Sequence, residues 1–174
     1  TLGKINYVLT ISRDYPYPTE NFLKICGGIF HDCATHDIDY VNYILNDIPE
    51  SVYVNVEDNT TKNNNYEHVC INFKYKKGTI VCLNLSRIAL SYDQRCEFYG
   101  ENGEIINNIY KKNKKISFQD RYKKAFINEI KEFYKCIKNN KQPLVKKNDC
   151  LNNHKIAEAC EKSIKLQKKI VNKY

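Results

Sequence analysis

The sequence lacks methionine and tryptophan, and its 174 residues include only four arginines and four prolines. No apolar run approaches the roughly 18 residues that a membrane-spanning helix requires. No basic segment followed by an apolar stretch opens the chain, as it would in a secretory signal. These absences predict a globular cytoplasmic protein. Because no methionine is present at which translation could start, we expect the chain to be a piece of a longer polypeptide.

The composition supports one folded domain with an uneven charge. Apolar residues make up 42% and aromatic residues 12% of the chain, enough for a hydrophobic core in a domain of this length. Residues 111–174 carry 19 basic and 6 acidic groups, net +13, while residues 1–110 carry 9 and 14, net −5. A basic half can bind nucleic acid, but arginine, the preferred reader of bases, is scarce. We favour solvated helix surfaces and predict no nucleic-acid partner.

Eight cysteines could form disulfides or ligate a metal. They are scattered, and a domain of this size needs no covalent staples, so free thiols in a reducing compartment are the favoured interpretation. Cys26, His31, Cys33 and His36 lie within eleven residues but form no C-x-x-C or H-x-x-x-H pair. Zinc is therefore the weaker alternative, and we predict no metal.

The first two thirds of the chain predict mostly strands. Residues 5–12 alternate as a strand, Pro16 and Pro18 indicate an extended loop, and residues 32–45 have helical spacing that Pro49 ends. The spacing of the apolar residues then changes to two, as in strands, in four segments: residues 51–57, 67–75, 79–85 and 96–100. Turn residues at 76–78 and 100–103 favour antiparallel pairing. Residues 58–65 form a predicted polar surface loop.

Two amphipathic helices are predicted at the end of the chain. One covers residues 121–139, and the other begins at a cap formed by Asn148 or Asp149 and has an apolar stripe that reaches Val171. The order of elements predicts an α+β domain, with one open, largely antiparallel sheet and helices packed on one face. The other face would be solvated, buried against another domain or paired with a second copy.

One segment, GGIFHDCATHDIDY, concentrates reactive side chains. Asp32 and His36 are four residues apart, so a helix would present both on one face. A carboxylate beside an imidazole can orient the imidazole and stabilise its cation, which suits a general base acting on an alcohol. Preceding glycines would let a ligand approach closely. A capping aspartate with a satisfied interfacial histidine would explain the same pair.

Five segments in order carry a resemblance to a known family. They are GKINYVLTISRDYPYP, GGIFHDCATHDIDYVNYIL, SYDQRCEFYGENGEI, RYKKAFINEIKEFYKCI and DCLNNHKIAEACEKS. Together they resemble the C-terminal domain of the glucose-fructose oxidoreductase and inositol dehydrogenase family, and they are most similar to its myo-inositol 2-dehydrogenase branch. The resemblance covers nearly the whole chain. It implies that residues 1–174 form a substrate-binding and oligomerisation domain.

The resemblance also implies a chemistry. His36 would accept the hydroxyl proton of a polyol or sugar during oxidation of a secondary alcohol, supported by Asp32. Asp14, Arg13 and Tyr92 would contact the substrate. NAD or NADP would be bound mainly by an N-terminal Rossmann domain that is absent here, since the sequence has neither a G-x-G-x-x-G loop nor the family's Glu-Lys-Pro motif.

Partners and activity follow from the same resemblance. The implied partners are the chain's own Rossmann domain, the polyol or sugar, and a second copy that pairs through the sheet. The fragment alone should be inactive. The alternative function is a catalytically degenerate family member that acts as an oligomerisation or interaction domain.

Overall fold

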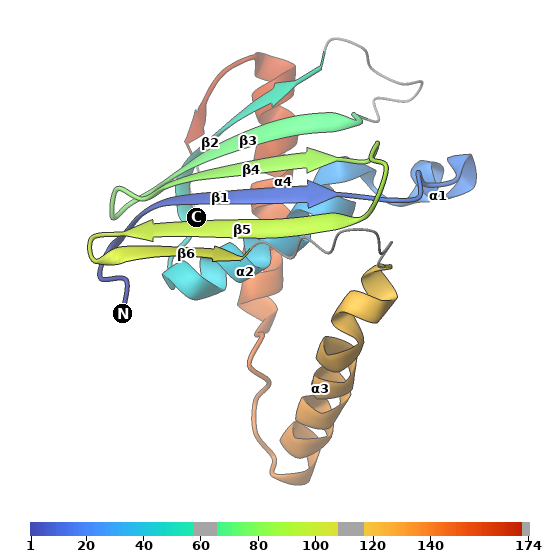
Figure 1. Cartoon of the computed structure of the whole chain (residues 1–174), viewed down its shortest axis with the longest axis vertical. Helices are drawn as coiled ribbons and strands as arrows, with labels where there is room; N and C mark the ends of the chain where they lie inside the picture. Colours follow the sequence, from blue (N-terminus) through green and yellow to red (C-terminus); the bar gives the residue numbers. More distant parts are fainter. Residues whose placement is uncertain (58–65, 108–116, 172–174) are drawn as a thin grey trace.

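The computed structural model describes residues 1–57, 66–107 and 117–171, so the polar loop predicted at 58–65 lies outside the described residues. Its centre is a seven-stranded sheet in the order β6-β5-β1-β4-β3-β2-β7 (Figure 1). The strands are β1 (Ile5–Arg13), β2 (Pro49–Val56), β3 (His68–Tyr75), β4 (Ile80–Ser86), β5 (Asp93–Gly100), β6 (Gly103–Asn107) and β7 (Ile170–Val171).

Every neighbouring pair in this sheet is antiparallel except one, so the predicted fold class is confirmed. The exception is β1 with β4, which run parallel with Tyr7 opposite Ile80 and Arg13 opposite Ser86. Parallel neighbours end at the same edge of a sheet. The residues that follow β1 and β4 therefore lie next to each other, although they are more than 70 positions apart in the sequence.

Helices cover one face of the sheet. A π-helical turn, η1 (Phe30–Ala34), leads directly into α2 (Thr35–Leu45), and both lie behind the sheet with α4 (Lys147–Leu166) in the view of Figure 1. A short helix, α1 (Glu20–Ile25), stands beyond the end of β1. No helix among the described residues is long and apolar enough to cross a membrane.

The core lies between the sheet and these helices. Alternate residues of β3 and β4 point toward the helices and are buried, among them Ile71 and Leu83, while the residues between them face outward. Ile38 of α2 and Ile156 and Cys160 of α4 fill the space opposite. The apolar side chains that recur every two residues in the strands and every 3.6 residues in the helices thus form one buried layer.

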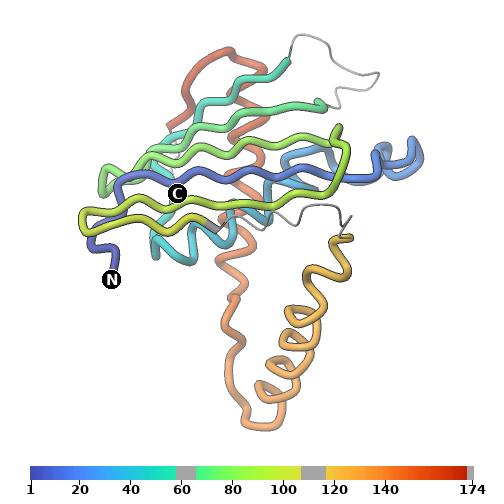
Figure 2. The backbone as a smooth tube through the Cα atoms, viewed as in Figure 1, coloured from blue at the N-terminus to red at the C-terminus, as the bar shows by residue number. Residues whose placement is uncertain are grey.

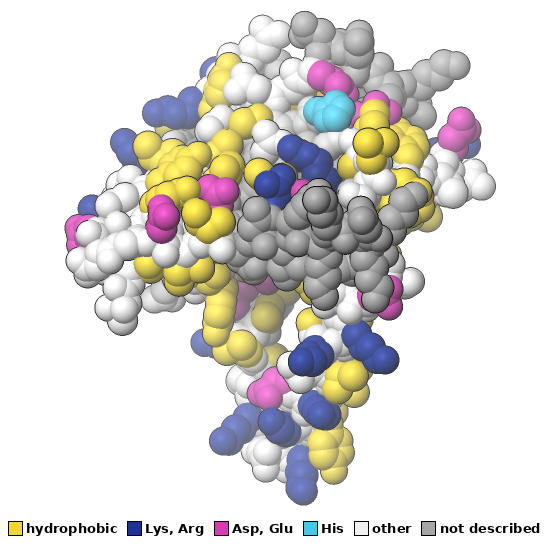
Figure 3. Space-filling view, viewed as in Figure 1, with side chains coloured by type: hydrophobic (Ala, Val, Ile, Leu, Met, Phe, Trp, Pro, Cys, Tyr) yellow, Lys and Arg dark blue, Asp and Glu magenta, His cyan; other side chains and the backbone are white. Residues whose placement is uncertain are grey.

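Among the described residues, no helix lies on the outer face of the sheet. Figure 3 shows apolar side chains mixed with basic and acidic residues on this side of the molecule. Tyr7, Tyr53 and Ile80 of this face are between 37% and 51% exposed. The described helices therefore cover one side of the sheet, as its sequence predicts.

Helix α3 (Phe118–Lys138) does not pack on the sheet. It extends away from the body, and the chain returns from its end to α4 (Figure 2). Its apolar stripe is largely exposed, with Ile130 at 69%, Phe133 at 63% and Ile137 at 66%, and only Cys136 is buried. Its helical pattern is confirmed, but the predicted sheet cover comes from α2 and α4 alone.

Several boundaries differ from the prediction. Helix α4 ends at Leu166, where Gln167 adopts a left-handed backbone (φ 48°), so Val171 belongs to β7 and not to the helix stripe. The residue that caps α4 is Lys146, and Asp149 instead accepts a hydrogen bond from its backbone N–H (2.8 Å). Pro49 is the first residue of β2, because α2 already ends at Leu45. The sequence patterns did not predict strands β6 and β7 or helix α1.

Candidate active site

The adjacent ends of β1 and β4 gather most of the polar side chains that the sequence singles out. The backbone N–H of Asp14, directly after β1, donates to the carbonyl of Ser86 at the end of β4 (2.9 Å). Arg87 comes next, and β5 begins at the same edge, since Asp93 pairs with Arg13. Helical turn η1 contacts β4 at this edge. The end of β1, the β4–β5 connection and η1, which are separate in the sequence, therefore meet at one place.

A pair of glycines begins the turn that carries Asp32. Gly27 and Gly28 both have positive φ angles, 78° and 86°, which other residues adopt only with strain. A Cβ at Gly27 would come within 3.3 Å of His31. The glycines thus permit the sharp entry into η1. The following turn is π-helical, a widened geometry that is frequent at functional sites.

Asp32 lies in this π-helical turn and pairs with arginine. Its Oδ2 accepts a hydrogen bond from Arg87 Nη2 at 2.7 Å. The Asp32 side chain is 27% exposed, whereas the Arg87 side chain is 1% exposed and lies beneath it in the interior. Among the described residues no hydrogen bond joins Asp32 to His36. The structure therefore places the carboxylate one helical turn before the imidazole but pairs it with Arg87.

His36 is exposed in the first turn of α2, above a buried acid. The next residue, Asp37, is fully buried, and its carboxylate accepts hydrogen bonds from Ser12 Oγ and from Gln94 Nε2 (2.7 Å). Burial raises the pKa of Asp37 to about 6, although the bond from Ser12 and the nearby His36 oppose the shift. This polar network fixes the start of α2 against β1 and β5.

Cys33 lies between two carboxylates. Its Sγ is 3.2 Å from Asp14 Oδ2 and 3.6 Å from Asp32 Oδ2. Burial, and then the charge of Asp14, raises the pKa of the Cys33 thiol far above its ordinary value. A thiol that stays protonated is a poor nucleophile. Cys33 therefore acts as a hydrogen-bond donor that holds Asp14 beside Asp32.

Tyr92 lies at the same edge, just before β5. Its ring contacts Phe118 and Tyr122 at the start of α3, with centroids 6.4 and 6.5 Å apart. Burial raises the pKa of its phenol, and Tyr122 and the charge of Asp14 raise it further. The structure thus brings Tyr92 and Asp14 to the edge that carries Asp32 and His36.

Arg13 is placed differently. Its Nη1 donates to the backbone carbonyl of Asn84 (2.9 Å) and its Nη2 to the Asn84 side chain (2.6 Å). Asn84 alternates along β4 with the buried Leu83 and Leu85, so it faces the outer side of the sheet. Arg13 therefore lies on the face opposite Asp32.

The described residues contain no group of three or more histidine, cysteine or acidic side chains that could hold a metal ion. His31 instead approaches Glu161 of α4, with Nε2 3.5 Å from Oε1, and its ring lies 5.0 Å from that of His154. All eight cysteines are free thiols. His31 thus joins η1 to α4, whereas Cys26 and Cys33 turn toward Arg87 and Asp14.

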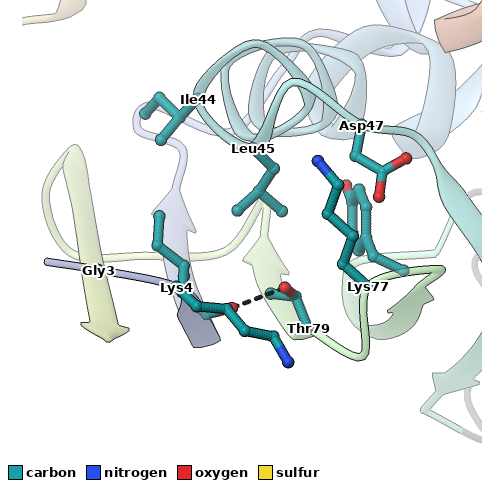
Figure 4. A pocket seen from close by; sticks show the side chains of 9 residues that line it. Gly3, Lys4, Ile44, Leu45, Asp47, Lys77 and Thr79 are labelled. Atoms are coloured by element: carbon teal, nitrogen blue, oxygen red, sulfur yellow. Dashed lines mark hydrogen bonds between the residues drawn. The ribbon is translucent and has the colours of Figure 1, made fainter. Parts of the chain in front are cut away.

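A cavity of about 220 Å³ lies at the opposite end of the sheet. Figure 4 shows its lining, in which Lys4 and Thr79 directly precede β1 and β4, Leu45 comes from α2, and Asp47 and Lys77 come from the connecting segments. It borders the start of β1 and the end of α2, so none of the candidate site residues reaches it. We therefore assign the site to the exposed edge and not to this cavity.

Comparison with known proteins shows to which family the chain belongs. The model of an oxidoreductase family, described as its C-terminal alpha/beta domain, matches residues 1–171. The chain belongs to this family. It is 27% identical over 168 residues to the myo-inositol 2-dehydrogenase of Thermotoga maritima, covering 86% of this chain and 50% of that protein. It is also 26% identical over 184 residues to the scyllo-inositol 2-dehydrogenase (NAD(+)) of Bacillus subtilis, covering 94% and 53%.

Solved structures share the fold of this family member. A putative myo-inositol dehydrogenase from Sinorhizobium meliloti superposes with a TM-score of 0.88 at 26% identity, covering 98% of this chain and 57% of that one. A scyllo-inositol dehydrogenase from Lactobacillus casei, solved with NAD(H) and scyllo-inositol, gives a TM-score of 0.83 at 19% identity, covering 98% and 57%, and shows the fold alone. The chain spans about half the length of the curated relatives it matches.

The described residues of this family member do not fit a dinucleotide by themselves. No glycine-rich phosphate loop joins a strand to a helix in the sequence. Gly27 and Gly28 precede η1, but they follow a helix, α1, and not a strand. The described residues therefore show no strand–loop–helix site of the kind that holds the pyrophosphate of a nicotinamide cofactor.

Sequence reasoning missed Arg87, and it treated Asp37 only as part of the helix pattern. One signal could have found the arginine. Only four arginines occur in the chain, and Arg87 directly follows the apolar strand TIVCLNLS. A cation at the end of a buried strand requires an anion nearby. The pattern does not say which carboxylate provides that anion, because the contact spans 55 residues.

Proposed function

We propose that this chain is the substrate-side domain of a nicotinamide-dependent dehydrogenase that oxidises a secondary alcohol of an inositol-like polyol. The observation that carries the proposal is the exposed His36 one helical turn after the carboxylate of Asp32, at an edge that Asp14 and Tyr92 also border. The names of the relatives from Thermotoga maritima and Bacillus subtilis support the substrate class.

In the proposed reaction His36 is the proton acceptor. The imidazole takes the proton of the hydroxyl as its carbon becomes a carbonyl, and an exposed imidazole can return that proton to solvent. Asp32 accepts a hydrogen bond from a neighbouring hydroxyl, and Asp14 and Tyr92 contact others. A nicotinamide, bound mainly by an additional domain, would supply the hydride acceptor, and NAD and NADP are both compatible with this chain.

The additional domain has a candidate docking surface on α3. The exposed stripe of this helix includes Ile130, Phe133 and Ile137. Arg121 Nη2 donates to the carbonyl of Gln94 (2.5 Å), so the start of α3 is fixed next to the site. Since the curated relatives are about twice as long as this chain, we propose that their extra domain covers the stripe and brings the cofactor to His36.

The outer face of the sheet is the proposed contact with a second copy. Ile80 is the first residue of the central strand β4 and is 51% exposed on this face. An Ile80→Glu variant should shift the complete protein toward monomers in light scattering. A native assembly that is unchanged by this variant would contradict pairing through the sheet.

The test of the enzyme uses the complete natural polypeptide that contains this chain. NAD and NADP reduction is measured with myo-inositol, scyllo-inositol and glucose. His36→Ala should lower kcat by roughly 100- to 10,000-fold, the usual contribution of a general base. The matched control is His154→Ala, an exposed helical histidine of α4 that pairs with Glu158; its activity should stay within about twofold of wild type.

Two outcomes would contradict the enzyme. If His36→Ala retains wild-type turnover, the histidine is not the proton acceptor. If the wild type reduces neither cofactor with any of these polyols but still assembles, the degenerate interaction domain becomes the better description. The exposed stripe of α3 is the observation that keeps this second function open.

A further inference from the structure

Arg87 is the largest fully buried side chain of the described residues, with 1% exposure. It directly follows β4, and its backbone N–H donates to the carbonyl of Glu67 (2.9 Å). Arginine cannot lose its proton inside a protein, so this side chain brings a permanent positive charge into the interior. Such a charge requires an anionic partner.

Asp32 is that partner. Arg87 Nη2 lies 2.7 Å from Asp32 Oδ2 and 3.5 Å from Cys26 Sγ. Arg87 Nε and Nη1 are buried and make no hydrogen bond with the described residues. The pair is therefore held by one short contact, and neutralising Asp32 would leave the guanidinium without its charge partner.

The hydrogen bond from Arg87 uses only Oδ2 of the Asp32 carboxylate. The other, Oδ1, has no hydrogen-bond partner among the described residues. The Asp32 side chain is 27% exposed, whereas the guanidinium is behind it in the interior. A carboxylate that is fixed from behind presents its remaining lone pairs in a constant direction.

We propose that Arg87 is a positioning residue for substrate selection. It holds the Asp32 carboxylate turned so that Oδ1 accepts a hydrogen bond from the hydroxyl adjacent to the one that gives its proton to His36. This inference rests on the proposed function, and it deepens it. The substrate class it selects is a vicinal diol in a ring, and a cyclic alcohol without the neighbouring hydroxyl should be a poor substrate.

The experiment pairs an enzyme variant with a change in the substrate. The complete natural polypeptide is assayed with myo-inositol and with a deoxy-inositol that lacks the hydroxyl next to the oxidised carbon. Wild type should prefer myo-inositol by about 100-fold in kcat/KM, because a site built to bind a hydroxyl rejects the analogue without it. Arg87→Met should lose about 100-fold with myo-inositol and prefer it by less than about tenfold.

Arg95→Met is the matched control. Arg95 also pairs with an aspartate, Asp93, through Nε at 2.9 Å, but it is 34% exposed. Its variant should keep both the rate and the preference. A merely structural role of Arg87 would lower the rate with both substrates equally and leave their ratio unchanged, which would overturn the proposal.

A second variant pair keeps the proposal testable if Arg87→Met does not fold. Asp32→Asn and the double variant Asp32→Asn, Arg87→Met should have the same kcat/KM, because Arg87 acts through the carboxylate that both lack. The double variant also buries no unpaired charge. A further loss in the double variant would overturn the positioning role. Absence of turnover in wild type would instead contradict the proposed function itself.

Discussion

Helices α3 and α4 are similar in length and charge but lie in opposite environments. They contain 21 and 20 residues, both are rich in lysine, and both have an apolar stripe. Yet α4 buries Ile156, Ala157, Cys160 and Ser163 against β2 and η1, while α3 buries only Cys136. The comparison shows that apolar residues at a spacing of 3.6 predict a helix face that is buried in a contact. They do not predict which part of the protein, or which partner, makes that contact.

The stripes differ in the size of their members. Helix α4 uses Ala157, Ala159 and Cys160, which allow a helix to approach a sheet closely, whereas α3 carries Phe126, Phe133 and Tyr134, which protrude. The large aromatic side chains suit an interface with a separate domain. The same contrast predicts that substitutions in α4 affect stability and substitutions in α3 affect assembly.

The largest expected effect tests the core side of this comparison. Ile156 is fully buried in α4, so Ile156→Ala should lower the free energy of unfolding by about 2–5 kcal/mol, because it removes buried methyl groups and leaves a cavity. Ile130→Ala in α3, at 69% exposure, should change it by less than about 0.5 kcal/mol. Urea unfolding of the 174-residue chain measures both. Equal losses would show that α3 packs on the body in solution.

The second prediction concerns the acid buried beneath α2. Because folding raises the pKa of Asp37 from 3.8 to about 6, the folded chain binds this proton more tightly than the unfolded chain. Its contribution to stability should therefore be greatest below about pH 4 and decline as the pH rises to about 6.

Asp37→Asn tests this directly. The amide can still bond Ser12 and Gln94, and it removes the buried charge, so the variant should gain on the order of 2 kcal/mol at pH 8 relative to wild type. Denaturant midpoints of wild type and variant, measured between pH 4 and 8, give the pH dependence of their stability. If the variant loses stability at pH 8, the carboxylate is a net stabilising group and the sign of this prediction is wrong. The mutation should leave the helicity of α3 unchanged.

Ser163 gives a smaller test on α4. Its Oγ is buried, accepts a hydrogen bond from the backbone N–H of Val54 (3.1 Å) and donates to the carbonyl of Lys168 (2.8 Å). Ser163→Ala leaves both backbone groups without this partner and should lower the free energy of unfolding by about 1–3 kcal/mol. Ser163→Thr, which retains the hydroxyl, serves as the comparison in the same unfolding assay. Identical midpoints for wild type and Ser163→Ala would contradict the structural role of the bond.

The smallest effect is expected at the start of α3. Ser117 caps this helix, and its Oγ accepts a hydrogen bond from the backbone N–H of Asp120 (3.2 Å). Ser117→Ala should weaken the helix by about 1 kcal/mol. Because α3 contacts the body mainly through its first turn, amide exchange should increase in α3 while the main unfolding midpoint moves little. A matching shift of the midpoint would show that α3 unfolds together with the sheet.

Part of the candidate site could be predicted from the sequence. Asp32 and His36 stand four residues apart in a segment rich in reactive side chains, and their placement on adjacent turns is a local consequence of helical geometry. Arg13 is grouped with Asp14 in the sequence prediction although strand alternation already separates the two, and only its partner is a tertiary feature. It precedes Asp14 directly, yet alternation along β1 sends its side chain to Asn84 on the other face of the sheet.

The sequence by itself determined most of the elements and the fold class, because a period of 2 or 3.6 is a property of neighbouring residues. Only the tertiary structure decided that β1 and β4 run parallel, that Arg87 pairs with Asp32, and that α3 extends away from the sheet. Each of these depends on contacts between residues far apart in the chain. Pairing across such separations follows from how all strands and helices pack together, which no local pattern records.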